Sequence, residues 1–149
     1  MSYFCIANLG RGNYFCVSRL KNQTQQHFSK KIIQMKEVTK EVYLKWYEDM
    51  LLWRKFEDKL AALYIQQKIR GFLHLYNGQE AVLAGALHAM DLTKDKMITA
   101  YRNHVQPIGM GVDPRRVMAE LMGKVTGTSK GMGGSMHIFS KEHRFYGGH

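Results

Sequence analysis

Polar residues with clear chemical potential lie directly after a short apolar segment. Residues 97–101 are typical of a buried strand, and Arg102, Asn103 and His104 follow at once. In open α/β sheets, ligands collect outside the carboxyl ends of strands. An arginine there can bind a phosphate through two parallel hydrogen bonds, which a lysine cannot do as well. The segment therefore predicts an anion site, although a surface arginine and histidine at a strand end would give the same pattern.

A glycine-rich run, residues 123–137, is a second candidate site. It holds five glycines and two lysines but no acidic residue. Glycine allows successive backbone N–H groups to turn inward, and such groups form a concave site for an anion. The run therefore predicts a cradle for phosphate or carboxylate. Glycine and serine clusters also mark flexible surface loops, so that alternative stays open.

His74 and the cysteines carry weaker signals. His74 precedes a turn signal at Asn77 and Gly78, where a lone histidine is more often structural than part of a site. Both cysteines, Cys5 and Cys16, lie in the leading segment. Nothing suggests a disulfide scaffold or a thiolate metal site, so an intracellular setting is the default.

The elements that must position these residues begin with a long amphipathic helix. Its pattern starts after Thr39, a suitable N-cap, and Gly71 is the expected stop. We expect its apolar residues to be core or subunit interface rather than a cofactor site. They fall on two tracks at helical spacing, Tyr43, Tyr47 and Met50 on one and Leu52, Phe56, Leu60 and Leu63 on the other.

Shorter elements follow. Alanines and a glycine over residues 81–89 predict a slim second helix. Asp113 and Pro114 predict the start of another, which Gly123 ends. Residues 135–139 could form a short strand, and the final residues, 145–149, have the character of a loop.

Charge and length bound the remaining possibilities. The chain has 149 residues, enough for one domain with a core, and a net charge of +10. Residues 1–36 hold six basic and no acidic side chains, which leaves the body with only +4. Such a body favours an anionic ligand without requiring nucleic acid. No apolar run approaches the roughly 18 residues of a membrane span.

The leading segment, residues 1–34, differs from the rest because it lacks a clear period. We expect a disordered extension or leader. It is either a targeting segment such as a mitochondrial transit peptide or an extension before a true start at Met35.

Several stretches of the body, taken together and in order, resemble the alpha subunit of the pyruvate dehydrogenase component of 2-oxo acid dehydrogenase complexes. The resemblance covers about residues 36–149. The stretches that carry it are residues 71–74, 78–81, 98–104, 119–123, 130–137 and 145–148.

This resemblance implies a thiamine-diphosphate-binding α/β fold with a mainly parallel sheet, of which residues 35–149 form an incomplete domain. It implies that His74, Tyr101 and Arg102 line the cofactor site, with Tyr101 and Arg102 facing the diphosphate. Ser140 falls at a further contact position, and His104 is a catalytic candidate without an assigned role. In this light the glycine-rich run becomes a tightly turned segment beside the site, whose glycines serve close packing.

The resemblance also implies a reaction and partners. The family decarboxylates pyruvate oxidatively and passes the acetyl group to lipoamide on the acyltransferase component, toward acetyl-CoA. It works as an alpha2-beta2 heterotetramer with a beta subunit. Its Mg²⁺ ligands would lie beyond residue 149, so we expect residues 1–149 alone to be inactive. No nucleic-acid or membrane partner is expected, and the location would be cytoplasmic in a bacterium or the mitochondrial matrix behind a transit peptide.

Other functions remain open at this point. Acetoin and branched-chain 2-oxo acid dehydrogenase alpha subunits share the pattern. A non-catalytic module that docks through the long aromatic helix is a second class, and nucleic-acid binding through the basic leading segment is a third.

Overall fold

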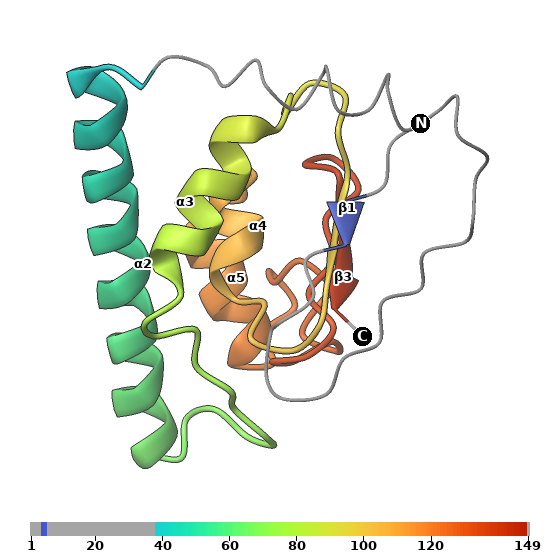
Figure 1. Ribbon diagram of the computed structural model, residues 1–149. Coiled ribbons are helices and arrows are strands. Elements are labelled where there is room, and N and C mark those ends of the chain that lie inside the picture. The colour runs from blue at the N-terminus through green and yellow to red at the C-terminus, as the bar shows by residue number, and fades with distance from the viewer. Residues whose placement is uncertain (1–3, 6–37, 149) are drawn as a thin grey trace, which may run out of the picture.

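The computed structural model describes residues 4–5 and 38–148, which form a small parallel sheet with helices to one side of it (Figure 1). The strands are β1 (Phe4–Cys5), β2 (Met97–Thr99) and β3 (Phe145–Gly148), in the order β1-β2-β3. The helices are α2 (Lys40–Ile65), α3 (Glu80–Ala89), α4 (Val105–Gly109) and α5 (Pro114–Leu121). The α/β class with a parallel sheet and a long preceding helix is thus confirmed.

The sheet register brings the carboxyl ends of β2 and β3 to the same edge. Met97 lies opposite Phe145 and Thr99 opposite Gly148, with an irregularity between them. On the other side of β2, Phe4 lies opposite Met97. The segment 1–34, expected to be a disordered extension or leader, therefore contributes two residues to the sheet. Its other residues, and the leader prediction with them, lie outside the described part of the chain.

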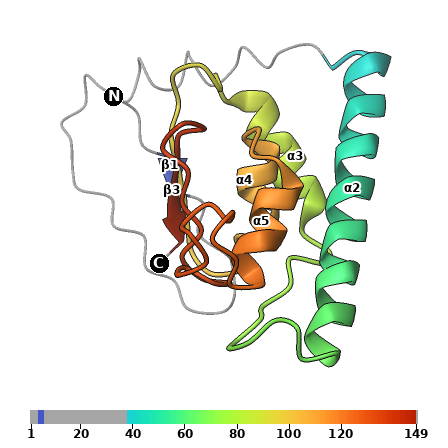
Figure 2. The ribbon, with the colours of Figure 1, turned by 180° about the vertical axis from the view of Figure 1, so that it is seen from behind.

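Helices α3, α4 and α5 lie between α2 and the sheet, as opposite views show (Figures 1 and 2). The core joins residues from all of these layers, since apolar side chains of each face inward. An ion pair reinforces the outer contact, because Arg54 on α2 donates two hydrogen bonds to the carboxylate of Glu80 at 2.6 and 3.0 Å. The most deeply buried apolar side chains include Trp53, Leu60, Leu83, Val105, Val117, Ile138 and Phe145.

Helix α2 begins after Thr39 as predicted but ends at Ile65, before the expected stop at Gly71. Gln67 ends it by adopting a left-handed backbone with φ 57°. The N–H of Gln67 donates to the carbonyl of Tyr64, and that of Lys68 to the carbonyl of Leu63. These two bonds form a Schellman motif, which usually places glycine at the left-handed position.

The two apolar tracks of α2 differ in burial. Phe56, Leu60 and Leu63 are buried as expected, whereas Leu52 on the same track is 46% exposed. Tyr43 and Tyr47 are 59% and 58% exposed, so of the two expected roles, core or subunit interface, they do not fill the core role in the described part of the chain. The helix is covered on one side, with its aromatic track on the other.

The shorter helices follow the sequence signals, with one addition. Helix α3 and helix α5 form where expected, and the Asp113 carboxylate caps α5 by accepting from the N–H of Arg115 at 2.8 Å. Gly123 ends α5 in a left-handed conformation with φ 66°. Helix α4 was not predicted, since Pro107 and Gly109 are turn signals. Proline is tolerated there because it lies in the first helical turn.

The strand expected at residues 135–139 is wrong, and the expected terminal loop is a strand. Residues 135–136 continue the turns of the glycine-rich run, and 137–139 have no regular structure. Strand β3 forms instead at Phe145–Gly148, whose two glycines suggest a loop. Its pairing with β2 overrides that local preference, which is common for short strands. No helix among the described residues is both long and apolar enough to cross a bilayer.

Candidate functional site

The carboxyl end of β2 brings Tyr101 and Arg102 together with His74 from the loop before α3. The rings of His74 and Tyr101 lie 5.1 Å apart between centroids, tilted by 51°. Nη1 of Arg102 donates a hydrogen bond to the carbonyl oxygen of Leu75. Three residues that the sequence assigns to one site therefore cluster at one edge of the sheet.

Arg102 adopts an unusual backbone conformation. Its φ is 72°, in the left-handed region that costs a non-glycine residue about 1–2 kcal/mol. Nε2 of Gln106 donates to its carbonyl oxygen at 2.9 Å and supports the turn. Backbone strain of this kind gathers at functional sites, where the surrounding structure holds it in place.

Several buried polar atoms near this turn have no hydrogen-bond partner among the described residues. They include Nδ1 of His74, Oδ1 of Asn103 and Oε1 of Gln106. Such atoms are rare in native structures and often mark a place where a ligand or water binds. The site thus offers a guanidinium, a phenol and an unpartnered imidazole nitrogen, a combination that suits an anionic, hydrogen-bonding ligand.

Strand β3 closes against the same edge. Gly148 lies beside Asn103 and the glycine-rich run, and a Cβ there would come within 2.9 Å of Asn103 Cγ and 3.0 Å of the Met136 carbonyl oxygen. Only glycine allows this approach of the backbone.

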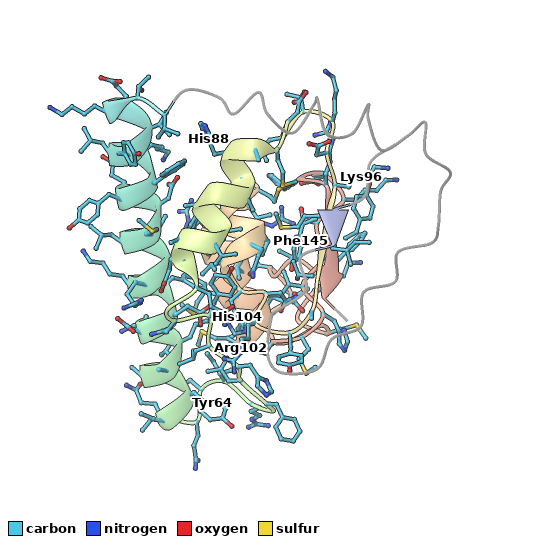
Figure 3. All side chains as sticks on the ribbon, in the orientation of Figure 1. Tyr64, His88, Lys96, Arg102, His104 and Phe145 are labelled. Atoms are coloured by element: carbon cyan, nitrogen blue, oxygen red, sulfur yellow. The ribbon has the colours of Figure 1, made fainter. Side chains whose placement is uncertain are left out.

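His104 lies inside the protein rather than at the open edge. It is fully buried, and its Nδ1 lies 3.0 and 3.1 Å from the carboxylate oxygens of Glu57. Its Nε2 lies 2.7 Å from Oγ of Ser135 (Figure 3 labels His104 and Arg102). Both imidazole nitrogens already have a partner within the protein. His104 therefore has no free nitrogen to contact a ligand directly.

Glu57, which is also fully buried, was not predicted to belong to a site. The signal was present, because Glu57 falls on the same helical face as Trp53 and Leu60, at spacings of four and three residues. A charged residue within a buried track is costly unless it is paired, and so calls for a partner.

The glycine-rich run is an anion cradle, and the anion is a carboxylate of the same chain. Glu120, at the end of α5, is fully buried and accepts hydrogen bonds from four backbone N–H groups. The donors are Ser129 at 2.7 Å, Gly131 at 2.9 Å, Gly133 at 2.6 Å and Gly134 at 3.2 Å. The predicted chemistry is confirmed, although the ligand is internal.

The run's glycines also serve close packing. A Cβ on Gly131 would lie 2.5 Å from the carbonyl carbon of Gly123 and 2.7 Å from its oxygen. A Cβ on Gly127 would lie 2.6 Å from Cα of Glu120. The run therefore serves both as an anion cradle and as a closely packed, tightly turned segment.

Ser140 lies at the opposite end of the strands from Arg102. It forms an antiparallel bridge with Phe145, which pairs with Met97 at the start of β2. Its Oγ lies 2.8 Å from Nδ1 of His143. The structure does not bring Ser140 to the cluster of His74, Tyr101 and Arg102.

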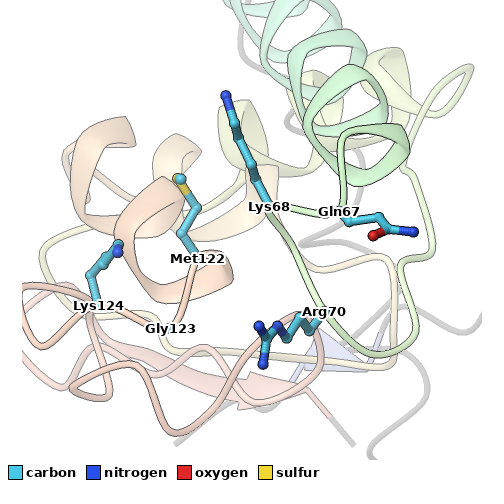
Figure 4. A pocket seen from close by; sticks show the side chains of 6 residues that line it. All are labelled: Gln67, Lys68, Arg70, Met122, Gly123 and Lys124. Atoms are coloured by element: carbon cyan, nitrogen blue, oxygen red, sulfur yellow. The ribbon is translucent and has the colours of Figure 1, made fainter.

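Two recesses in the surface lie away from this cluster. One, of about 580 Å³, lies between the ends of α2 and α5 (Figure 4). The other, of about 530 Å³, lies between α2 and α3. No predicted cofactor-site residue lines either one, although the glycine-rich run begins at the edge of the first. The first recess is basic, since its lining residues are Gln67, Lys68, Arg70, Met122, Gly123 and Lys124.

Two ionisable groups near the site have shifted pKa values. Burial raises the pKa of Tyr76 to about 12, and the negative charge of Glu80 adds to the effect. The hydrogen bonds from Arg54 lower the pKa of the Glu80 carboxyl, against the opposing effect of burial. Among the described residues, no group of three or more histidine, cysteine, aspartate or glutamate side chains is arranged to hold a metal ion.

Comparison with known proteins gives a consistent result. Residues 48–149 match the family model described as dehydrogenase E1 component. The chain is 54% identical over 112 residues to "Pyruvate dehydrogenase E1 component subunit alpha-3, chloroplastic" of Arabidopsis thaliana, covering 74% of this chain and 26% of that protein. It is 53% identical over 114 residues to "Pyruvate dehydrogenase E1 component subunit alpha" of Rickettsia conorii, covering 74% and 34%. The chain therefore spans only about a third or less of the length of these relatives.

Proposed function

Because this chain belongs to the dehydrogenase E1 component family, we propose that it contributes the diphosphate-binding part of a thiamine diphosphate site in a pyruvate dehydrogenase alpha subunit. The supporting observation is the position of Arg102, at the carboxyl end of β2 beside His74 and Tyr101. The relatives named above are pyruvate dehydrogenase subunits. Oxidative decarboxylation of pyruvate, with transfer of the acetyl group to lipoamide, is the reaction we assign to the whole protein.

The residues at this edge suit that cofactor. Arg102 uses Nη1 to anchor itself to the Leu75 carbonyl, which leaves its other N–H groups to face a diphosphate. The Tyr101 side chain is 52% exposed and can donate from its hydroxyl, while His74 retains an unpartnered Nδ1. When bound, thiamine diphosphate acts as the electron sink for decarboxylation. The role of these side chains is to hold and orient it.

The finer features of the proposal rest on family membership. We propose a thiamine-diphosphate-binding fold, Mg²⁺ as the accompanying metal ion, a beta subunit in an alpha2-beta2 heterotetramer, and the lipoyl acyltransferase component as the acetyl acceptor. Cofactor contact is assigned to His74, Tyr101 and Arg102. Ser140 is left out, because it lies at the other end of the strands.

The test is the affinity of the full-length protein, complexed with its beta subunit, for thiamine diphosphate. Quenching of tryptophan fluorescence on titration reports binding, and Arg102→Lys should weaken it about tenfold or more because the bidentate geometry is lost. Arg70→Lys is a matched control, since Arg70 lines the separate basic recess. Equal affinity of Arg102→Lys and the wild type would contradict the assignment. Turnover of pyruvate, acetoin and a branched-chain 2-oxo acid by the same complex identifies the substrate.

A further inference from the structure

A continuous chain of buried hydrogen bonds joins three segments that are far apart in the sequence. Glu57 lies on α2, His104 directly precedes α4, and Ser135 lies in the glycine-rich run. The imidazole connects the other two, with 3.0 Å to Glu57 Oε1 and 2.7 Å to Ser135 Oγ. Glu57 and His104 are fully buried and Ser135 is 7% exposed. None of them belongs to the proposed set of cofactor contacts.

The chemistry of the chain gives it a direction. An ionised carboxylate only accepts hydrogen bonds, so Nδ1 of His104 carries the proton that faces Glu57. In the neutral imidazole, Nε2 is then an acceptor for the Ser135 hydroxyl. With a partner at each ring nitrogen, His104 is held in both position and orientation between α2 and the glycine-rich run.

This anchor lies two residues after Arg102. Arg102 has a left-handed backbone, which persists only where its surroundings hold it. The residue between them is also tied to the glycine-rich run, because Nδ2 of Asn103 donates to the carbonyl of Met136 at 3.5 Å. Both residues that follow Arg102 are therefore fixed against the same neighbouring segment.

We propose that the Glu57–His104–Ser135 chain positions Arg102 for the diphosphate, and that His104 is a positioning residue rather than a catalytic one. This inference rests on the proposed function, in which Arg102 faces the cofactor. Without the Ser135 hydroxyl, the imidazole loses one of its two anchors and the turn that carries Arg102 loosens. The guanidinium then meets the diphosphate less well, which lowers cofactor affinity more than it lowers turnover by the loaded enzyme.

The experiment uses the full-length protein in complex with its beta subunit. In Ser135→Ala, the apparent KM for thiamine diphosphate should rise about tenfold, and kcat at saturating cofactor should stay within about twofold. Direct titration by tryptophan fluorescence should show the same loss of affinity without reliance on activity. Ser129→Ala is the matched control. The Ser129 hydroxyl lies in the same glycine-rich run, but it donates to the His137 carbonyl and takes no part in the Glu57–His104–Ser135 hydrogen bonds. It should leave both values unchanged.

A conservative variant tests the hydrogen bonds themselves. In Glu57→Gln the amide can donate to Nδ1, so the proton moves to Nε2 and the His104–Ser135 bond persists in the reverse direction. Its KM should stay within about threefold of the wild type, whereas Glu57→Leu should resemble Ser135→Ala. A purely structural role would lower kcat and thermal stability along with cofactor affinity.

The outcomes separate the two proposals. If the wild-type complex does not bind thiamine diphosphate, the proposed function fails and the positioning role fails with it. If the wild type binds and Ser135→Ala has the same KM and affinity, or Glu57→Gln and Glu57→Leu behave alike, only the positioning role is overturned.

Discussion

The carboxylate of Glu120 accepts a 2.6 Å hydrogen bond from the backbone N–H of Gly133, thirteen residues further along the chain. Its other oxygen accepts from Ser129 and Gly131. A single side chain at the end of α5 therefore organises a run of fifteen residues that has only three apolar side chains of its own. The run in turn carries Ser135, which contacts His104 behind the proposed site.

Glu120→Gln should destabilise the protein by about 2–4 kcal/mol, because hydrogen bonds to a buried charged group are strong and the new amide NH₂ would face backbone donors. Urea denaturation measures the change in the free energy of unfolding. Glu142→Gln is the control, since that side chain is 75% exposed and should shift stability by less than about 0.5 kcal/mol. Equal stability of the two variants would contradict an organising role for Glu120.

Gly131 and Gly134 distinguish two reasons for glycine in the run, which are a left-handed backbone and close packing against a neighbouring backbone. Both have positive φ, 77° and 58°, but a Cβ on Gly131 meets the Gly123 backbone, whereas one on Gly134 meets nothing within 4 Å. Gly134→Ala should cost about 1–2 kcal/mol from its left-handed backbone alone. Gly131→Ala should cost about 1–3 kcal/mol more because of the overlap. The two values come from denaturant unfolding, and a smaller loss in Gly131→Ala would show that the close packing is absent.

Much of the fold and part of the site could be predicted from sequence because local chemistry specified them. Asp113, the N-cap, and Pro114, the first residue of α5, mark the start of that helix, and the polar residues after β2 mark the edge of the candidate site. Helical spacing located α2 well at its beginning. Predictions that rest on a strong positional preference of one residue, such as Asp113 as the N-cap of α5, are confirmed.

The misses have a common physical cause, since they depend on contacts between distant segments. Strand β3 exists because β2 offers it hydrogen bonds, and its own glycines give no sign of a strand. The anion in the glycine-rich cradle comes from Glu120, which the run itself does not contain. The partner of His104 is Glu57, 47 residues earlier. Single-sequence patterns describe neighbours along the chain and so could not pair these residues.

We expect the buried phenol of Tyr76 to cause a loss of stability at alkaline pH. Its pKa is raised from 10.0 in a model peptide to about 12 in the folded protein, chiefly by burial. The folded state thus disfavours the phenolate, whereas the unfolded chain forms it freely above about pH 10. This contribution to stability is complete below pH 10 and is lost as the pH rises toward 12. Urea denaturation at several pH values should show a shallower decline in Tyr76→Phe than in the wild type.

The control for that experiment is Tyr43→Phe, which removes an exposed phenol. Its stability should fall with pH as steeply as that of the wild type. A Tyr76→Phe curve parallel to the wild-type curve would show that the buried phenol does not contribute to the alkaline decline.

The end of α2 offers a substitution that should stabilise the protein. Gln67 occupies the left-handed position of the Schellman motif with φ 57°, and it is exposed. Gln67→Gly removes the clash of Cβ with the following carbonyl, and should raise the free energy of unfolding by about 1 kcal/mol. Gln66→Gly tests the position of this effect, because Gln66 has φ −75° and glycine there only adds freedom to the unfolded chain. That neighbour should lose about 0.5–1 kcal/mol, and the same sign of change in both variants would place the end of the helix elsewhere.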